Sequence, residues 1–354
     1  MNRSLRRAAL PGVVALTIGL AVSACGSESS GQTLNGAGSS AQESAMKAWR
    51  AGYQKAHSDA TINYNPSGSG AGVQSFTTGG VDFAASDAAL DPTKNEVDAA
   101  KKRCDGKNAL EVPSYVSPIA VVFKLSGVDS LNLSAKTIAD IFDGKVTKWN
   151  DPEIAAENKG ATLPGTAITT VHRSDESGTT KNFTDYLSKA AGGAWTYPAD
   201  KVWPLKSGEA ANGTSGVIAA IKDGSIGYAD ESQAGSLSKA SIKVGNAYVA
   251  PTADGAAKAL EVSPLDTTRT PGDMAIKVDR TTTEAGAYPL FLASYVIACP
   301  TYSSKAKADE IKGFLSYVVS TEGQQAAATS AGSAPLPAAL QTKAAAIIAT
   351  IAAK

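Results

Sequence analysis

Residues 167–187 read AITTVHRSDESGTTKNFTDYL and bring three patterns together in one short segment. The run from Ala167 to His172 predicts a β-strand, and residues Thr179–Lys189 predict a helix. Between them, the small and polar cluster DESGTT occupies residues 175–180. A strand that passes through a short glycine-containing loop into a helix is typical of α/β folds.

The same alternation of strands and helices extends along the rest of the chain. Further strands are predicted at Thr61–Tyr64, Phe83–Ala85, Ile119–Lys124, Ser225–Tyr228 and Ala293–Cys299. Further helices are predicted at Ala41–Lys55, Val73–Thr78, Ala135–Phe142, Thr214–Lys222, Ser304–Ser320 and Pro337–Ala353. This order predicts α/β domains with mostly parallel sheets, which bind ligands at the carboxyl ends of their strands.

Composition excludes several classes of protein. The chain has 354 residues, of which 43% are hydrophobic and 19% charged, as expected of a soluble globular protein with about two domains. Its 33 basic and 33 acidic residues argue against a nucleic-acid partner, because such binders carry a basic excess. With two histidines and three cysteines, a structural zinc site or an iron–sulfur cluster is not expected. We therefore predict no metal and no cofactor.

The first 24 residues have the pattern of an export signal. They carry three arginines and no acid, followed by an uncharged and mostly apolar stretch from Ala8 to Val22. Residues 22–25 read VSAC and resemble the bacterial lipobox, in which the cysteine is acylated, as by palmitate, and becomes the new N-terminus. We expect residues 1–24 to be a lipoprotein signal peptide and 25–33 a tether lipidated at Cys25, outside the cytoplasmic membrane. The alternative is an ordinary signal peptide with a chance cysteine.

The two remaining cysteines are Cys104 and Cys299. An even pair in an oxidising compartment suggests one disulfide. Two buried free thiols are the alternative that the sequence leaves open.

Three clusters of glycine and hydroxyl residues follow predicted strands or precede predicted helices. They are GAGSS at 36–40, SGSGAG at 67–72 and DESGTT at 175–180. Glycine lets backbone N–H groups approach a ligand, and a helix start offers unpaired N–H donors. One such cluster alone is no more than a helix cap, but three in one chain indicate an anion site.

Arg173, Asp175 and Asp87 refine the prediction. A guanidinium at Arg173 can bind a tetrahedral oxyanion with two hydrogen bonds, and Asp175 can orient it. Asp87, at the end of VDFAASD, would repel an anion unless the anion carries a proton. Hydrogen phosphate can donate that proton to Asp87, whereas sulfate at neutral pH cannot.

These motifs resemble one family over most of the chain, the phosphate-binding proteins (PstS) of bacterial Pst-type ABC transporters. The resemblance is carried by GAGSSAQESAMKAW from Gly36, NYNPSGSGAGV from Asn63, VDFAASDAAL from Val81, IADIFDGKVTKWNDPEI from Ile138, HRSDESGTTKNFTDYL from His172 and SGVIAAIKDGSIGYAD from Ser215. The combination of DF-x-x-SD with R-x-D-x-SGTT is the most specific part of it.

The resemblance implies a phosphate site, residue by residue. The residues that match the family's phosphate ligands are Ser40, the backbone N–H of Ala41, Ser69, Asp87, Arg173, Ser177, Gly178 and Thr179. Asp175 matches the carboxylate that supports the arginine. Ala41-Gln42 stands where family members often have an aromatic residue and proline.

The resemblance also implies a type II periplasmic-binding-protein fold, with a ligand cleft between two α/β lobes joined by hinge strands. Residues 34–123 with 290–354 would form the first lobe, and 124–289 the second. The implied function is a high-affinity extracytoplasmic phosphate receptor, lipid-anchored to the cell membrane, that delivers phosphate to the permease and ATPase subunits of an ABC transporter. The alternatives are a receptor for sulfate or molybdate and, less in keeping with the sequence, a phosphatase or serine hydrolase. We expect no enzyme, because the chain has neither a G-x-S-x-G elbow nor a Walker motif.

Overall fold

The computed structural model describes residues 32–354. The predicted signal peptide, the lipidation site at Cys25 and most of the tether lie outside the described residues. Within the described part, no helix is long and apolar enough to cross a membrane.

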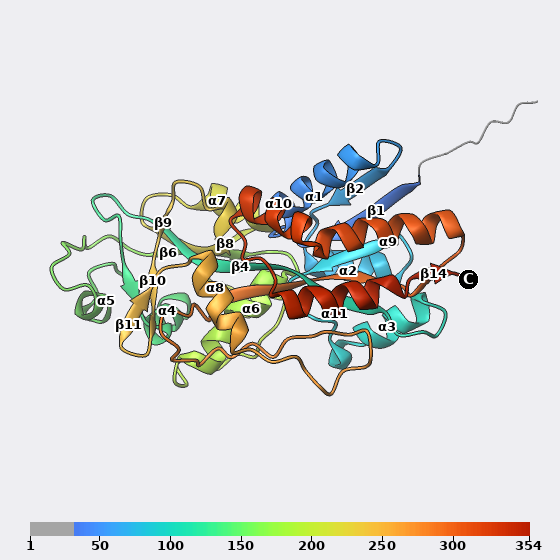
Figure 1. Ribbon diagram of the computed structural model, residues 1–354. Helices are drawn as coiled ribbons and strands as arrows, with labels where there is room; N and C mark the ends of the chain where they lie inside the picture. Colours follow the sequence, from blue (N-terminus) through green and yellow to red (C-terminus); the bar gives the residue numbers. More distant parts are fainter. Residues whose placement is uncertain (1–31) are drawn as a thin grey trace, which may run out of the picture. The chain divides into compact units, whose positions relative to one another are not determined.

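A mixed sheet of nine strands runs through the molecule (Figure 1). Its order is β2 (Thr61–Asn65), β1 (Thr33–Gly38), β3 (Phe83–Ser86), β12 (Phe291–Ala298), β4 (Leu110–Lys124), β8 (Ser225–Asp230), β6 (Thr169–Arg173) and β7 (Glu209–Ala211), with β9 (Ser238–Lys239) paired to β4. Two small sheets comprise β11 (Ala247–Val249), β10 (Ser241–Val244) and β5 (Asn132–Leu133), and β13 (Thr301–Tyr302) with β14 (Ala352–Ala353). The sheet is parallel at both ends and antiparallel around β12 and β4, where the prediction of mostly parallel pairing does not hold.

The helices flank this sheet. They are α1 (Glu43–Ala56), α2 (Ser69–Thr77), α3 (Glu96–Arg103), α4 (Ala135–Phe142), α5 (Pro152–Glu157), α6 (Gly178–Ala190), α7 (Gly213–Ala220), α8 (Ala253–Glu261), α9 (Lys305–Val319), α10 (Thr321–Ala331) and α11 (Ala338–Ala349). Two 3-10 turns are η1 (Pro92–Lys94) and η2 (Glu231–Gln233). The predicted helix at Pro337–Ala353 is wrong at its end, because Ala352 and Ala353 pair with β13.

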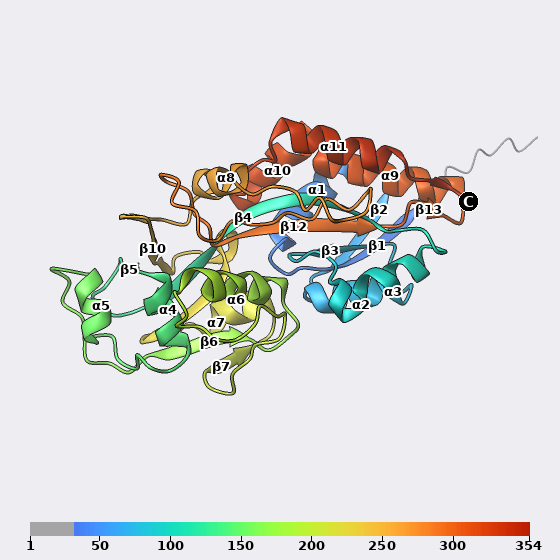
Figure 2. The same ribbon diagram turned by 90° about the horizontal axis from the view of Figure 1, so that it is seen from below.

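The sheet passes between two lobes through β4. Residues 110–118 of β4 pair with β12, and residues 119–124 pair with β8, so the change of partner falls at Pro118. Proline lacks a backbone donor and is tolerated where a strand changes its pairing. Figure 2 shows β4 and β12 running side by side along the molecule.

Each lobe has its own apolar core. The first packs β1, β3 and β12 against α1 and α9, with Trp49, Phe83 and Phe314 fully buried. The second packs β8 against α4 and α6, with Phe142 and Phe183 fully buried. A smaller cluster places α8 against Val116 of β4 and residues of β12. The lobe boundaries at residues 123/124 and 289/290 stay a prediction.

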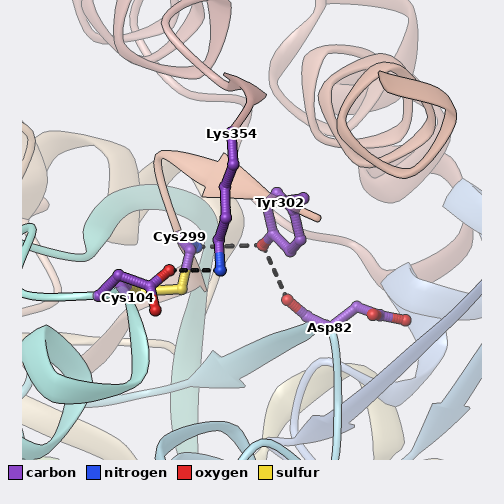
Figure 3. Close-up of a disulfide and its surroundings, with 6 residues drawn as sticks. Asp82, Cys104, Cys299, Tyr302 and Lys354 are labelled. Carbon is purple, nitrogen blue, oxygen red and sulfur yellow. Dashed lines mark hydrogen bonds and ion pairs between the residues drawn. A yellow bond between two sulfur atoms is a disulfide. The ribbon is translucent and has the colours of Figure 1, made fainter. Parts of the chain in front are cut away.

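A disulfide joins Cys104, at the end of α3, to Cys299, just after β12. The pair suggested by the cysteine count is thus present, across 195 positions of sequence. Tyr302 supports it: its hydroxyl accepts from the backbone N–H of Cys299 at 3.0 Å and donates to the carbonyl of Asp82 at 2.9 Å (Figure 3). The bridge therefore joins the end of α3 to the end of β12.

Candidate functional site

The three small-residue clusters lie at one place in the fold. Each lies where a strand ends and a helix begins, at β1–α1, β2–α2 and β6–α6. Gly68 N–H donates to the carbonyl of Gly38 at 2.8 Å, and Gly70 N–H donates to the carbonyl of Glu176 at 2.9 Å. The first two clusters belong to the first lobe and the third to the second lobe. The candidate site is therefore built between the lobes, from helix starts that present N–H donors.

Asp87 lies at the centre of this arrangement and is 2% exposed. Its Oδ2 accepts from the hydroxyl of Thr179 at 3.3 Å and from that of Ser69 at 3.4 Å. The Asp87 N–H in turn donates to Ser69 Oγ at 3.1 Å. Two predicted site residues, one from each lobe, thus meet at the carboxylate of a third.

The other oxygen of Asp87 is held by two serines that the sequence analysis did not select. Ser39 Oγ donates to Asp87 Oδ1 at 2.5 Å, and Ser294 Oγ donates to the same atom at 2.9 Å. Ser39 was within reach of prediction, because it belongs to the GAGSS cluster. Ser294 was not, because it lies in an apolar strand more than 200 positions away from Asp87.

Burial and hydrogen bonding act on Asp87 in opposite directions. Burial raises the pKa of Asp87 above its ordinary value. The donors Ser39 and Ser294 and the charge of Arg173 oppose that rise, since each favours the ionised form. A buried carboxylate in such a setting is an acceptor that calls for a donor from whatever binds beside it.

Arg173 is 2% exposed and forms an ion pair with Asp175. Its Nε donates to Asp175 Oδ1 at 2.7 Å and its Nη2 to Oδ2 at 2.5 Å, a two-bond pair. Although burial alone would raise the pKa of Asp175, the Arg173 guanidinium holds it below the ordinary value. Asp175 therefore fixes the direction of the guanidinium, the supporting role expected for it.

Ser40 and Ala41 make no hydrogen bond to the Asp87 carboxylate. Ser40 Oγ lies 3.0 Å from Thr214 Oγ1 and accepts from Thr214 N–H at 3.1 Å. Ala41 N–H donates to Ser39 Oγ at 3.1 Å. Thr214, at the start of α7, was also missed, although the run NGTSG at 212–216 has the composition of the three clusters that were recognised.

The start of α6 carries the last three predicted residues. Ser177 caps the helix, with its Oγ accepting from Thr180 N–H at 3.2 Å. Gly178 lies so close to the first lobe that a Cβ there would meet Ser69 Oγ at 2.6 Å and Asp87 Cβ at 2.7 Å. Only glycine fits at this position, which explains the glycine of the SGTT motif.

Asn182 and Arg280 connect the site to a neighbouring cavity. Asn182 Nδ2 donates to the carbonyl of Asp87 at 2.5 Å, and its Oδ1 accepts from the 2%-exposed Arg280. Both line a cavity of about 530 Å³ that reaches Asp87. Neither was predicted: Asn182 lies within the segment quoted from His172 but after the SGTT cluster, and Arg280 lies outside the motifs. Among residues 32–354, no group of three or more His, Cys, Asp or Glu is placed to hold a metal ion.

The comparisons with known proteins agree on one family. A model described as PBP superfamily domain matches residues 23–322. Phosphate-binding protein PstS2 of Mycobacterium bovis is 36% identical over 323 residues, which cover 89% of this chain and 86% of that protein. Phosphate-binding protein PstS3 of the same species is 39% identical over 292 residues, covering 80% and 78%.

Solved structures share the fold at lower identity. A periplasmic phosphate-binding protein, PfluDING, determined with phosphate bound, has a TM-score of 0.73 at 21% identity, covering 89% of this chain and 93% of that one. A phosphate-binding protein from Stenotrophomonas maltophilia has a TM-score of 0.69 at 20% identity, covering 89% and 93%. The predicted type II periplasmic-binding-protein fold is confirmed by these likenesses.

Proposed function

The chain belongs to the PBP superfamily and, within it, to the phosphate-binding PstS proteins, and we propose that it is an extracytoplasmic receptor that binds inorganic phosphate for import by an ABC transporter. Its named relatives are phosphate-binding proteins. The site described above supplies the chemistry that such a ligand needs.

The observation that carries this proposal is that Asp87 is buried among hydroxyl donors from both lobes, within reach of the charge of Arg173. Arg173 offers a positive charge and N–H donors to a tetrahedral oxyanion. Asp87, buried within a group of hydroxyl donors, adds an acceptor that an anion can satisfy only by donating a proton. Hydrogen phosphate can do this at neutral pH, whereas sulfate would place its lone pairs against those of Asp87.

The remaining ligands in this proposal come from both lobes. From the first lobe we assign the hydroxyls of Ser40 and Ser69 and the N–H of Ala41. From the second lobe we assign Ser177, Gly178 and Thr179 at the start of α6, together with Arg173. A ligand held by both lobes is bound completely only when they are closed, so binding shifts the population toward the closed state. We infer that the transporter recognises this closed state.

Attachment and partners follow from the sequence rather than from the described residues. The lipobox-like VSAC supports acylation of Cys25 and a lipid anchor outside the cell membrane. The family membership supports a permease and an ATPase as partners. We infer a transport receptor rather than an enzyme, because the serines of the site cap a helix, donate to Asp87 or bond Thr214. None of these hydrogen bonds pairs a serine with a histidine base.

Calorimetric titration tests the proposal. The chain without its leader, freed of bound anion, is titrated with phosphate and then with sulfate at pH 7, and Asp87→Asn is titrated alongside. We expect tight binding of phosphate, no heat with sulfate, and weaker discrimination by Asp87→Asn, whose amide can donate to sulfate. The absence of phosphate binding by the anion-free chain would overturn the proposed function.

A further inference from the structure

The two oxygens of Asp87 have different partners, and only Oδ2 has a partner from the second lobe. Oδ1 accepts from Ser39 and Ser294, both of the first lobe. Oδ2 accepts from Thr179 of the second lobe and, at 3.4 Å, from Ser69. One oxygen therefore faces the interior of the first lobe, and the other faces the interface where the oxyanion would bind.

The direction of the Ser39 hydrogen bond is fixed by its other contacts. Ser39 Oγ accepts from the N–H groups of Ala41 at 3.1 Å and Gln42 at 3.2 Å, which occupies its two lone pairs. Its own proton is then the only group it can offer to Asp87. Asp87 Oδ1 consequently cannot carry a proton toward Ser39, and Ser39 holds this oxygen as an acceptor.

Ser294 reaches Asp87 through the register of β12 on β3, on the edge away from a β-bulge in β4. Along β12, Ser294 pairs with Tyr115 but Tyr295 pairs with Pro113, so Ser114 of β4 is the extra residue of a β-bulge. On its other edge, Tyr295 pairs with Ser86, the residue before Asp87. Continued by one residue, this register places Ser294 opposite Asp87, just past the end of β3 where the loop begins.

We propose that Ser39 and Ser294 are specificity-determining positioning residues, which hold Asp87 Oδ1 as a saturated acceptor and leave Oδ2 ionised to receive the proton of the bound oxyanion. This inference rests on the proposed function and deepens it. Without the two donors, Asp87 would take up a proton more readily. Protonated Asp87 would then donate a hydrogen bond from Oδ2, and the site would bind oxyanions that have no proton to donate.

The other charged and titratable groups that act on Asp87 stay in place when Ser294 is changed. Arg173 favours its ionised form. Burial raises the pKa of Asp230 of β8 and that of Tyr64 of β2, and the charge of Asp87 raises both pKa values further. A shift in the titration of Asp87 in a Ser294 variant is therefore attributable to the lost hydroxyl.

Sulfate binding measured from pH 4 to pH 8 tests the inference, because sulfate can bind only when Asp87 is protonated. Loss of one hydrogen bond to an ionised carboxylate shifts its pKa by about one to two units. In Ser294→Ala, we expect the midpoint of sulfate binding to move up by at least about one pH unit. The phosphate-to-sulfate affinity ratio at intermediate pH should then fall about tenfold. Ser294→Thr keeps the hydroxyl and should keep the wild-type midpoint.

Ser114→Ala is the matched control. Ser114 is as buried as Ser294 and lies on the adjacent strand, but its hydroxyl donates to the Ser294 carbonyl rather than to Asp87. If Ser294→Ala does not fold, Ser294→Cys preserves the side-chain volume with a weaker donor and should give a smaller shift in the same direction. The inference is overturned if the pH midpoint of sulfate binding in Ser294→Ala equals the midpoint in wild type and in Ser114→Ala, even where wild type binds phosphate. A wild type that binds no phosphate would overturn the function and the inference together.

Discussion

Lys201 and Glu96 form an ion pair that spans the two lobes, with only 7% and 16% of their side chains exposed. Glu96 is the first residue of α3 in the first lobe, and Lys201 precedes Trp203 of the second core. Two further pairs also connect the lobes: Lys94 with Asp200, and Lys181 of α6 with Asp91, each at 2.8 Å. The two lobes are therefore connected by ion pairs as well as by hydrogen bonds at the site.

Removing Lys201 should weaken phosphate binding without touching the site. The closed state loses a partly buried pair and leaves Glu96 uncompensated, a penalty of about 1–2 kcal/mol. We expect Lys201→Ala to lower phosphate affinity by about 5- to 30-fold in calorimetry. The loss should be smaller in 0.5 M salt than in 0.05 M salt, because salt already screens the pair.

Lys305→Ala provides the control for this change. Lys305 pairs with Asp309 within α9, where the side chains are 83% and 54% exposed. An exposed pair within one helix contributes little. Equal phosphate affinities for Lys201→Ala and Lys305→Ala would show that the ion pairs between the lobes do not stabilise closure.

Replacing Arg173 by lysine should reduce phosphate affinity at least about a hundredfold. Lysine keeps the charge, but it loses the planar fork that bonds Asp175 through Nε and Nη2 and points at the ligand. The measurement is phosphate titration of Arg173→Lys, with Arg50→Lys as the control. The native Arg50 lies within the first lobe, where its Nε donates to the Ile62 carbonyl. An affinity for Arg173→Lys within threefold of that for Arg50→Lys would remove Arg173 from the site.

The local elements of the fold were predictable where sequence signals agreed. Helix α4 matches its predicted bounds, since Ser134 caps it and apolar residues recur on one face. The end of α11 was not predictable, because alanine favours helix locally while Ala352 and Ala353 pair with β13. The change of partner along β4 depends on long-range pairing that no local pattern contains.

The site was predictable to the extent that its residues belong to motifs. Asp87, Thr179 and Ser69 meet as the clusters suggested. Two neighbouring serines were harder to tell apart. A period of two along an extended chain places them on opposite sides, and Ser39 rather than Ser40 faces Asp87. Ser294 comes opposite Asp87 through the pairing of β12 with β3, which no local pattern contains.

The disulfide should contribute about 2–5 kcal/mol to the free energy of unfolding. It closes a segment of 195 positions, so its loss returns considerable freedom to the unfolded chain. We expect Cys104→Ala with Cys299→Ala to show this loss in urea unfolding, while the folded double variant still binds phosphate. Reductant should destabilise the wild type by a similar amount and leave the double variant unchanged. Equal stabilities in the oxidised state would refute the prediction.

Asp230 should make the stability of the fold depend on pH. It is buried at the end of β8, where its carboxylate accepts from Tyr115 Oη at 3.1 Å and from Ser232 N–H at 3.0 Å. Burial raises the pKa of Asp230 to about 7, although the hydroxyls of Ser232 and Tyr115 act against the rise. The folded state thus binds a proton that the unfolded state releases near pH 4, and stability is lost as pH rises from there through about 7.

Asp230→Asn removes this titration while keeping an acceptor oxygen for Tyr115 and Ser232. We expect the free energy of unfolding of wild type, relative to Asp230→Asn, to fall between pH 4 and pH 8 by up to about 4 kcal/mol. Urea unfolding at pH 4, 6 and 8 measures the difference, and Asp309→Asn on the exposed face of α9 serves as the control. A constant difference between wild type and Asp230→Asn over this range would mean that Asp230 is ionised in the fold throughout. The charge of Asp87 next to it would then have to be balanced by more than Arg173, because each ionised carboxylate raises the pKa of the other.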